Sequence, residues 1–256
     1  MYHSVQNLNR PNLSRIYYLE SKIQLLKMVR TLGFSIPTLL FPIIFYTFFG
    51  IIFSMSASMP TYVMVTYAVF GIMGPALFSF GVDIAIERGQ GWFDMKEVSP
   101  MPASAYIVSR VVLALIFSLI VVMLLFSMAA LFADVRLERV QWILIAVISI
   151  LGALPFCAIG MTLGLYLKSS SAPAIVNLIY LPMSILSGLW MPINFFPEYL
   201  QYFANILPAY HLAQINLKVI DMDIGGNLWQ HISVLLAYLL IFTYLAIVAY
   251  YKKDKK

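Results

Sequence analysis

Charged residues are missing from five long stretches of this 256-residue sequence. Lysine, arginine, aspartate and glutamate are all absent from residues 31–82, 111–133, 140–167, 169–197 and 224–251. A helix needs about 20 apolar residues to cross the hydrocarbon core of a bilayer, so the first stretch is long enough for two crossings and each of the others for one. Since 62% of all residues are hydrophobic and 11% are charged, these stretches indicate an integral membrane protein and exclude a soluble globular domain.

The five stretches therefore predict an all-α integral membrane fold with six transmembrane helices. The loops left between these helices are too short to fold as a second domain, so residues 1–256 are expected to form a single transmembrane domain. The predicted membrane spans are 32–55, 62–82, 106–133, 142–167, 173–190 and 229–251.

The distribution of lysine and arginine predicts how the helices are oriented. With six crossings both termini lie on one side of the membrane, and that side holds 13 of the 16 lysines and arginines. The other side holds Arg136, Arg139 and Lys218. Because the cytoplasmic side retains positive loops, we expect both termini in the cytoplasm, an N-in/C-in topology. The net charge of +5 follows from this topology, and the scattered basic residues do not predict nucleic-acid binding.

An amphipathic helix is predicted ahead of the first span, over residues 14–30. Ile16, Leu19, Ile23 and Leu26 recur at helical spacing, and most of the charged side chains fall elsewhere around the helix. Such a helix lies in the membrane interface with its basic residues at the lipid headgroups. The pattern leaves open whether this N-terminal interfacial helix only anchors the chain or also contacts a cytoplasmic partner.

Two carboxylates mark the inner end of the second span. Asp83 and Glu87 are four residues apart, so they share one face if the helix continues through them. Arg110, at the start of the third span, is expected to neutralise one of them. Gly89 and Gly91 then break the helix.

The longest inner loop follows these glycines, and it predicts a short amphipathic helix on the cytoplasmic side. Trp92, Met95 and Val98 recur at helical spacing beside charged residues, and Pro100 and Pro102 terminate the pattern. A helix displayed in this way can dock a soluble partner. A solvated turn without a partner fits the same residues.

The outer stretch 191–212 is too apolar and too aromatic for a free loop. Pro192, Pro197 and Pro208 divide it into short pieces. We predict short outer helices that re-enter the outer leaflet of the membrane here. The aromatic pattern fits packing as well as it fits a gate on a substrate path.

Motifs for chemistry within the chain are missing. The sequence has no HExxH or GxSG motif, its three histidines are scattered, and no metal site is predicted. It also lacks a GxxxxGK[ST] loop, so ATP-driven work would require a separate subunit, and the chain itself is not expected to be an enzyme. The spans hold no ionisable residue at midplane for ion coupling, which favours an external motor over an ion gradient.

Residues 87–100, ERGQGWFDMKEVSP, resemble the segment between the second and third spans in permeases of the type 2 exporter family of ABC transporters. Residues 187–214, SGLWMPINFFPEYLQYFANILPAYHLAQ, are similar to the Gly-x-x-x-Pro, Phe-Pro and Leu-Pro-x-Tyr-His pattern that follows the fifth span in that family. The chain departs from the family pattern at Trp92, where threonine is usual, and at Lys96 and Glu97, where the family tends to be apolar.

The resemblance implies a permease subunit of an ATP-driven exporter, with ATP and magnesium bound by a separate ATP-binding subunit. In the family the inner loop forms a cytoplasmic coupling helix seated on that subunit, and the N-terminal interfacial helix lies against it. Two permeases, as a homodimer or a heterodimer, would assemble with two ATP-binding subunits in a bacterial inner (plasma) membrane. The residues implied in coupling are Glu87, Arg88, Gly91, Trp92, Asp94, Val98, Ser99 and Pro100.

By the same resemblance, the first, second and fifth spans line the substrate path. The candidate path residues are Phe45, Phe49, Tyr67, Phe70 and Met183. The sequence does not name the substrate. A secondary transporter or channel driven by an ion gradient is the alternative function, and a membrane assembly factor that transports nothing is a third.

Overall fold

The computed structural model describes residues 12–92 and 101–253, which form helices joined by turns and loops. No strand occurs in these ranges, and the predicted all-α fold is confirmed. The helices in chain order are α1 (Leu13–Arg30), α2 (Leu32–Tyr46), the π-helix η1 (Thr47–Ile52), α3 (Met59–Gly89), α5 (Ala103–Phe132), α6 (Arg139–Leu151), α7 (Ala153–Tyr166), α8 (Ala172–Leu186), the 3-10 helix η2 (Ile193–Phe195), α9 (Glu198–Ala204), α10 (Pro208–Lys218) and α11 (Leu228–Lys253).

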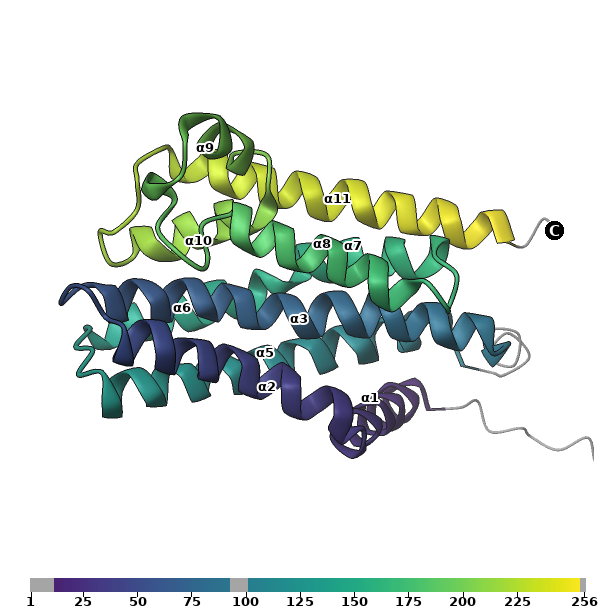
Figure 1. Ribbon diagram of the computed structural model, residues 1–256. Helices are drawn as coiled ribbons and strands as arrows, with labels where there is room; N and C mark the ends of the chain where they lie inside the picture. Colours follow the sequence, from purple (N-terminus) through teal and green to yellow (C-terminus); the bar gives the residue numbers. More distant parts are fainter. Residues whose placement is uncertain (1–11, 93–100, 254–256) are drawn as a thin grey trace, which may run out of the picture.

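Helix α3 forms the centre of the bundle, with α2, α5, α7, α8 and α10 packed around it (Figure 1). Its residues are apolar on all sides, and nearly every side chain from Tyr62 to Ala85 is buried. A helix without a polar face is stable when neighbours cover it completely, so the sequence of α3 accounts for its central place. By contrast, α11 packs mainly on α7 and α10 and leaves most of its apolar surface exposed.

Two glycines let α7 approach α3 closely. A Cβ at Gly164 would collide with the carbonyl oxygen of Phe80, and a Cβ at Gly160 would lie 2.9 Å from the Cβ of Phe80. The same Cβ at Gly160 would lie 3.0 Å from the carbonyl oxygen of Ala76. Small residues four apart allow this close approach in membrane helix pairs. The face of α7 that carries both glycines is therefore covered by α3.

Helices occupy all six of the segments predicted to span the membrane. Within the described ranges, four helical segments are long and apolar enough to cross a bilayer, namely Met59–Gly89, Ser104–Phe132, Arg139–Tyr166 and Leu228–Tyr250. The segment formed by α2 and η1, and helix α8, are apolar but shorter. Helix α8 has 15 residues, which is about 22 Å of helix, and the hydrocarbon core is about 30 Å thick. The crossing of these two segments stays a prediction.

Several of the apolar helices contain prolines. Pro155, in the first turn of α7, has no N–H to donate to the carbonyl of Leu151, and the helix is broken at Gly152. The predicted fourth span is thus two helices, α6 and α7, in series. Further prolines lie inside α2, α3 and α8, at positions Pro37, Pro42, Pro75 and Pro182.

The two ends of the bundle carry different elements. Helix α1 and the last turns of α3 and α11 lie at one end, and α9 and α10 lie at the other (Figure 1). We call these the inner end and the outer end, after the predicted topology. At the outer end Pro197 precedes α9 and Pro208 begins α10, so prolines divide this segment as predicted. Helix α10 is buried from Pro208 to Leu217.

Helix α1 packs on α5 at the inner end. Met28 is buried against Leu113 and Phe117 of α5, while Leu19 and Ile23 on another face are exposed. The helix predicted over residues 14–30 is therefore present, one residue longer at its start. Its place in the membrane interface stays a prediction.

Candidate functional site

The carboxylate of Glu87, in the last turn of α3, is buried and joins three helices. Its Oε1 lies 2.7 Å from the Nζ of Lys27 on α1 and 2.7 Å from a guanidinium nitrogen of Arg110 on α5. The hydroxyl of Tyr106, also on α5, donates a hydrogen bond of 2.6 Å to Oε2. A buried carboxylate is stable when it is both paired and hydrogen bonded, and here the partners come from two neighbouring helices. We call these four residues the Glu87 cluster.

Arg110 extends this cluster along α3. Its side chain is fully buried, and besides the ion pair with Glu87 it donates a hydrogen bond of 2.5 Å to the carbonyl oxygen of Ser79. It also lies 3.7 Å from a carboxylate oxygen of Asp83. The expectation that Asp83 and Glu87 share a face and that Arg110 neutralises one of them is confirmed, with Glu87 as the closer partner. The two carboxylates are matched by two cations, Arg110 and Lys27.

Arg88 connects α3 to a different part of the inner end. Its guanidinium donates a hydrogen bond of 2.5 Å to the carbonyl oxygen of Leu167, directly after α7. Gly89 lies against Ser169, because a Cβ at Gly89 would be 2.8 Å from the hydroxyl oxygen of Ser169. The last turn of α3 is thereby joined to α1 and α5 on one side and to the loop between α7 and α8 on the other.

Four of the eight predicted coupling residues fall within the described ranges. Glu87 and Arg88 face neighbouring helices, and Gly91 has a φ of 75° that ends α3. Trp92 is exposed, and the Nζ of Lys27 lies 5.8 Å from the centre of its ring. The other four lie outside the described residues, namely Asp94, Val98, Ser99 and Pro100. Glu87 and Arg88 thus bond to neighbouring segments of the chain, and Trp92 is the exposed residue of the four.

Aromatic rings from α2, α3, α8 and the turn after α8 meet on one face of the bundle. The ring of Phe45 lies 4.7 Å from that of Trp190 and 6.4 Å from that of Tyr67, centre to centre. The ring of Phe70 lies 5.6 Å from Trp190 and stacks on Tyr180 at 5.0 Å. These distances and tilts are those of favourable ring pairs. We call these five residues the aromatic cluster.

Three of the candidate path residues, Phe45, Tyr67 and Phe70, belong to the aromatic cluster. Phe49 is joined to it by a ring contact of 6.0 Å with Phe45, and Met183 is buried on α8.

Two members of the aromatic cluster, Tyr180 and Trp190, are not among the path residues predicted from the sequence. Tyr180 lies three residues before Met183 on α8, so helical spacing was an available signal. Trp190 follows a turn in which Gly188 has a φ of 74°, and no helical pattern predicts that the chain turns back onto α3 there.

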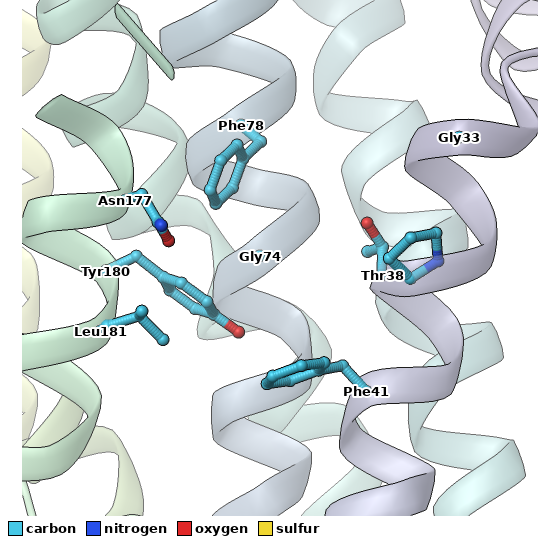
Figure 2. Close-up of a pocket in the computed structure, with 9 residues that line it drawn as sticks. Gly33, Thr38, Phe41, Gly74, Phe78, Asn177, Tyr180 and Leu181 are labelled. Atoms are coloured by element: carbon cyan, nitrogen blue, oxygen red, sulfur yellow. The ribbon is translucent and has the colours of Figure 1, made fainter. Parts of the chain in front are cut away.

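A groove of about 330 Å³ lies between α2 and α8, with α3 as its floor (Figure 2). The ring of Phe41 joins it to the aromatic cluster, at 4.6 Å from Phe45 and 6.3 Å from Phe70. None of the described side chains that line the groove is charged. Its lining includes Thr38 and Phe41 of α2, Gly74 and Phe78 of α3, and Asn177 and Tyr180 of α8.

A pair of buried histidines joins α10 to α11 at the outer end. The Nδ1 atoms of His211 and His231 lie 2.8 Å apart, and the Nε2 of His211 lies 2.9 Å from the carbonyl oxygen of Asn205. Because a carbonyl oxygen only accepts, Nε2 of His211 carries a proton, and in the neutral pair its Nδ1 accepts from His231. Burial lowers the pKa of His211, and the hydrogen bond to Asn205 opposes this only in part. Across the described ranges, no three side chains of the metal-binding types gather into a site.

Comparison with known proteins connects these features to a family. Residues 17–220 match the sequence profile of the family described as ABC-2 type transporter. Over 231 residues the chain is 26% identical to "Putative transport permease YvfS" of Bacillus subtilis (strain 168), which covers 89% of this chain and 94% of that protein. It is also 29% identical to "ABC transporter G family member 20" of Dictyostelium discoideum over 105 residues, which are 38% of this chain and 14% of that protein.

The matched range contains the Glu87 cluster, the aromatic cluster and the groove. With the apolar helices of membrane-crossing length, the matches identify a multi-pass membrane protein.

Proposed function

The chain belongs to the ABC-2 type transporter family, and from that membership we propose that it is the permease subunit of an ATP-driven exporter. A separate ATP-binding subunit would bind ATP and magnesium and hydrolyse the ATP, while this chain supplies the path through the membrane. The observation that carries the proposal is the Glu87 cluster. It joins α1, α3 and α5 where the predicted coupling loop begins.

The Glu87 cluster supports a mechanism in which the inner end moves as one unit. Short charge-assisted bonds hold Glu87 to Lys27 and Arg110, so a force applied to the loop after α3 reaches α1 and α5 as well. Gly91, with its positive φ, allows the sharp turn between α3 and that loop. Closure of the ATP-binding subunits would supply the force.

The same helix connects the inner end to the groove. Because α3 is the floor between α2 and α8, movement of its inner end would change how far these two helices separate. Arg88 adds a second connection, since the Leu167 carbonyl that it holds lies just ahead of α8. ATP binding would then shift the population from inward-open to outward-open states of the path. Phe45, Phe49, Tyr67, Phe70 and Met183 are the proposed path residues.

The assembly we propose contains two permeases and two ATP-binding subunits in a bacterial inner membrane, with the inner end in the cytoplasm. Exposed basic side chains on α1, Arg15, Lys22 and Arg30, would meet anionic lipid headgroups at that surface. Trp92 is the exposed member of the described coupling residues and the proposed point of contact with the ATP-binding subunit.

Purification in mild detergent from the native membrane, followed by mass spectrometry of stoichiometric partners, tests the proposed function. We expect a soluble subunit with a P-loop to co-purify with the tagged protein. Its reproducible absence, together with transport that follows an ion gradient in vesicles, would favour a secondary transporter instead. Absence of any transport in vesicles that contain both subunits would favour an assembly factor.

A further inference from the structure

Asn177 presents a carboxamide to the groove, and the described chain offers it no hydrogen-bond partner. The residue is exposed on α8, in a helix that is otherwise almost entirely apolar. Figure 2 shows its side chain directed from α8 toward the space over α3. In a bilayer an amide without a partner costs free energy, because lipid chains neither donate nor accept hydrogen bonds.

The surroundings of Asn177 are aromatic and uncharged. The rings of Phe41, Phe78 and Tyr180 line the groove around it, and Phe78 meets Tyr180 edge-on at 5.8 Å. The hydroxyl of Tyr180 already donates a hydrogen bond of 3.3 Å to the carbonyl oxygen of Phe70. A charged ligand would therefore find no counter-ion here, and a sugar chain would find too few polar groups to replace its water.

The dimensions of the groove suit one small molecule. Its volume of about 330 Å³ falls within the range of small-ligand sites in proteins. A few placed polar groups in an apolar pocket are the usual means by which such sites orient a ligand.

We propose that the groove binds an uncharged, mainly aromatic ligand that carries a hydrogen-bonding group, and that Asn177 selects for that group. The inference rests on the proposed function, because it assigns this chemistry to the molecule that the permease exports. Rings of the ligand pack on Phe41, Phe78 and Tyr180, and the carboxamide of Asn177 bonds to its polar group. Charged compounds and polysaccharides are excluded as ligands of this groove.

Two matched dyes test the proposal on the purified permease in lipid nanodiscs, without the ATP-binding subunit. N-phenyl-1-naphthylamine is uncharged and carries a single N–H, and 8-anilino-1-naphthalenesulfonate has the same rings with an added sulfonate. Both fluoresce more strongly in apolar surroundings, and empty nanodiscs give the background. We expect saturable binding of the uncharged dye alone.

Asn177→Leu is expected to weaken binding of the uncharged dye roughly three- to tenfold, the effect of one lost hydrogen bond. This variant removes a polar group from an apolar helix, so it is expected to fold. Asn194→Leu makes the same change at an exposed position in η2, outside the groove, and should leave the affinity as it is.

Equal affinity of the uncharged dye for all three proteins, preference for the sulfonate, or no saturable binding would each overturn the proposal. Loss of dimers in Asn177→Leu, measured by native mass spectrometry, with unchanged dye binding would assign the groove to a second copy instead. Failure of the ATP-binding subunit to co-purify would refute the proposed function but leave an Asn177-dependent dye site in place. The two failures are thus distinguishable.

Discussion

At the inner end of the bundle, Lys27, Tyr106 and Arg110 converge on the carboxylate of Glu87 with distances of 2.6–2.7 Å. Around the groove between α2 and α8, by contrast, aromatic rings of α2, α3 and α8 pack at 4.6–6.4 Å, and the groove stays open beside them. Charge-assisted hydrogen bonds are short and directional. Ring pairs are favourable over a wide range of separations and tilts.

The inner end is therefore the part of the molecule that keeps its shape, and the region around the groove is the part that can change it. Displacing α1 from α3 breaks an ion pair to a buried carboxylate, whereas sliding α8 along α3 exchanges one ring arrangement for another. The hydrogen bond that links these two helices at the groove, from Tyr180 to Phe70, is 3.3 Å long and correspondingly weak. We therefore expect conformational change in this permease to concentrate at α2 and α8.

The largest effect is expected at the Glu87 cluster. Glu87→Gln leaves the buried guanidinium of Arg110 without its closest counter-charge, and should lower the free energy of unfolding by about 3–5 kcal/mol. Thermal or denaturant unfolding in detergent measures the change. Asp134→Asn is the matched control, because it removes one partner of an ion pair with Arg136 that is almost fully exposed. Equal stability of the two variants would mean that the inner end is not held by this cluster.

A second comparison is between the side of α3 that packs on α7 and the side that faces the groove. Gly164→Ala places a Cβ against the carbonyl of Phe80 and should destabilise the protein by about 1–3 kcal/mol. Gly33→Ala, at the groove, adds a Cβ with no atom within 4 Å and should be neutral or slightly stabilising. The free energy of unfolding, measured for both variants, compares the effect of the same substitution in the two regions. A neutral Gly164→Ala would show that α3 and α7 readily separate.

Gly91→Ala tests the turn between the inner end and the coupling loop. A Cβ at a φ of 75° costs about 1–2 kcal/mol, so the turn should open and transport should fall several-fold while ATP hydrolysis by the complex continues. Both rates are measured in proteoliposomes that contain the ATP-binding subunit. Gly225→Ala imposes the same strain at a φ of 98° in an outer loop and should leave coupling intact. Unchanged coupling in Gly91→Ala would remove the turn from the mechanism.

The smallest effect is expected from pH at the outer end. Burial lowers the pKa of His211 below its ordinary value of 6.5, so the neutral form is favoured in the folded state and its stabilising contribution is complete above pH 6.5. This contribution is lost as the pH falls from 6.5 through the lowered pKa, and hydrogen exchange in α10 should then accelerate. His211→Asn should flatten this dependence. Exchange in α3, which contains no histidine, serves as the internal control.

Local spacing in the sequence predicted part of the inner end. Asp83 and Glu87 share a helical face because 3.6 residues make a turn, and Arg110 begins the next helix, so their meeting followed from short-range geometry. Lys27 was not assigned to Glu87, because the two residues are 60 positions apart and only the packing of α1 on α5 brings them together.

At the aromatic face, hydrophobicity identified membrane-crossing segments, but spacing did not separate rings that meet one another from rings that face lipid. Phe45, Tyr67 and Phe70 are in the cluster, whereas Phe41 and Asn177 of the groove were not selected from the sequence. The place of Trp190 in the cluster depends on the turn at Gly188, and helical periodicity does not predict that turn. The predicted fifth span extends to residue 190, whereas this turn ends α8 at Leu186.

The position of Lys27 in the chain has a consequence for how the protein is made. Helices enter the membrane in the order of synthesis, and an ionised carboxylate that reaches the hydrocarbon boundary alone is costly. Lys27 is synthesised 60 residues before Glu87, so in the predicted topology a cation is already present at the inner end when the last turn of α3 is inserted. Arg110 is synthesised after Glu87, so its carboxylate partner is already present. Neither the carboxylate nor the guanidinium has to be inserted without a counter-charge.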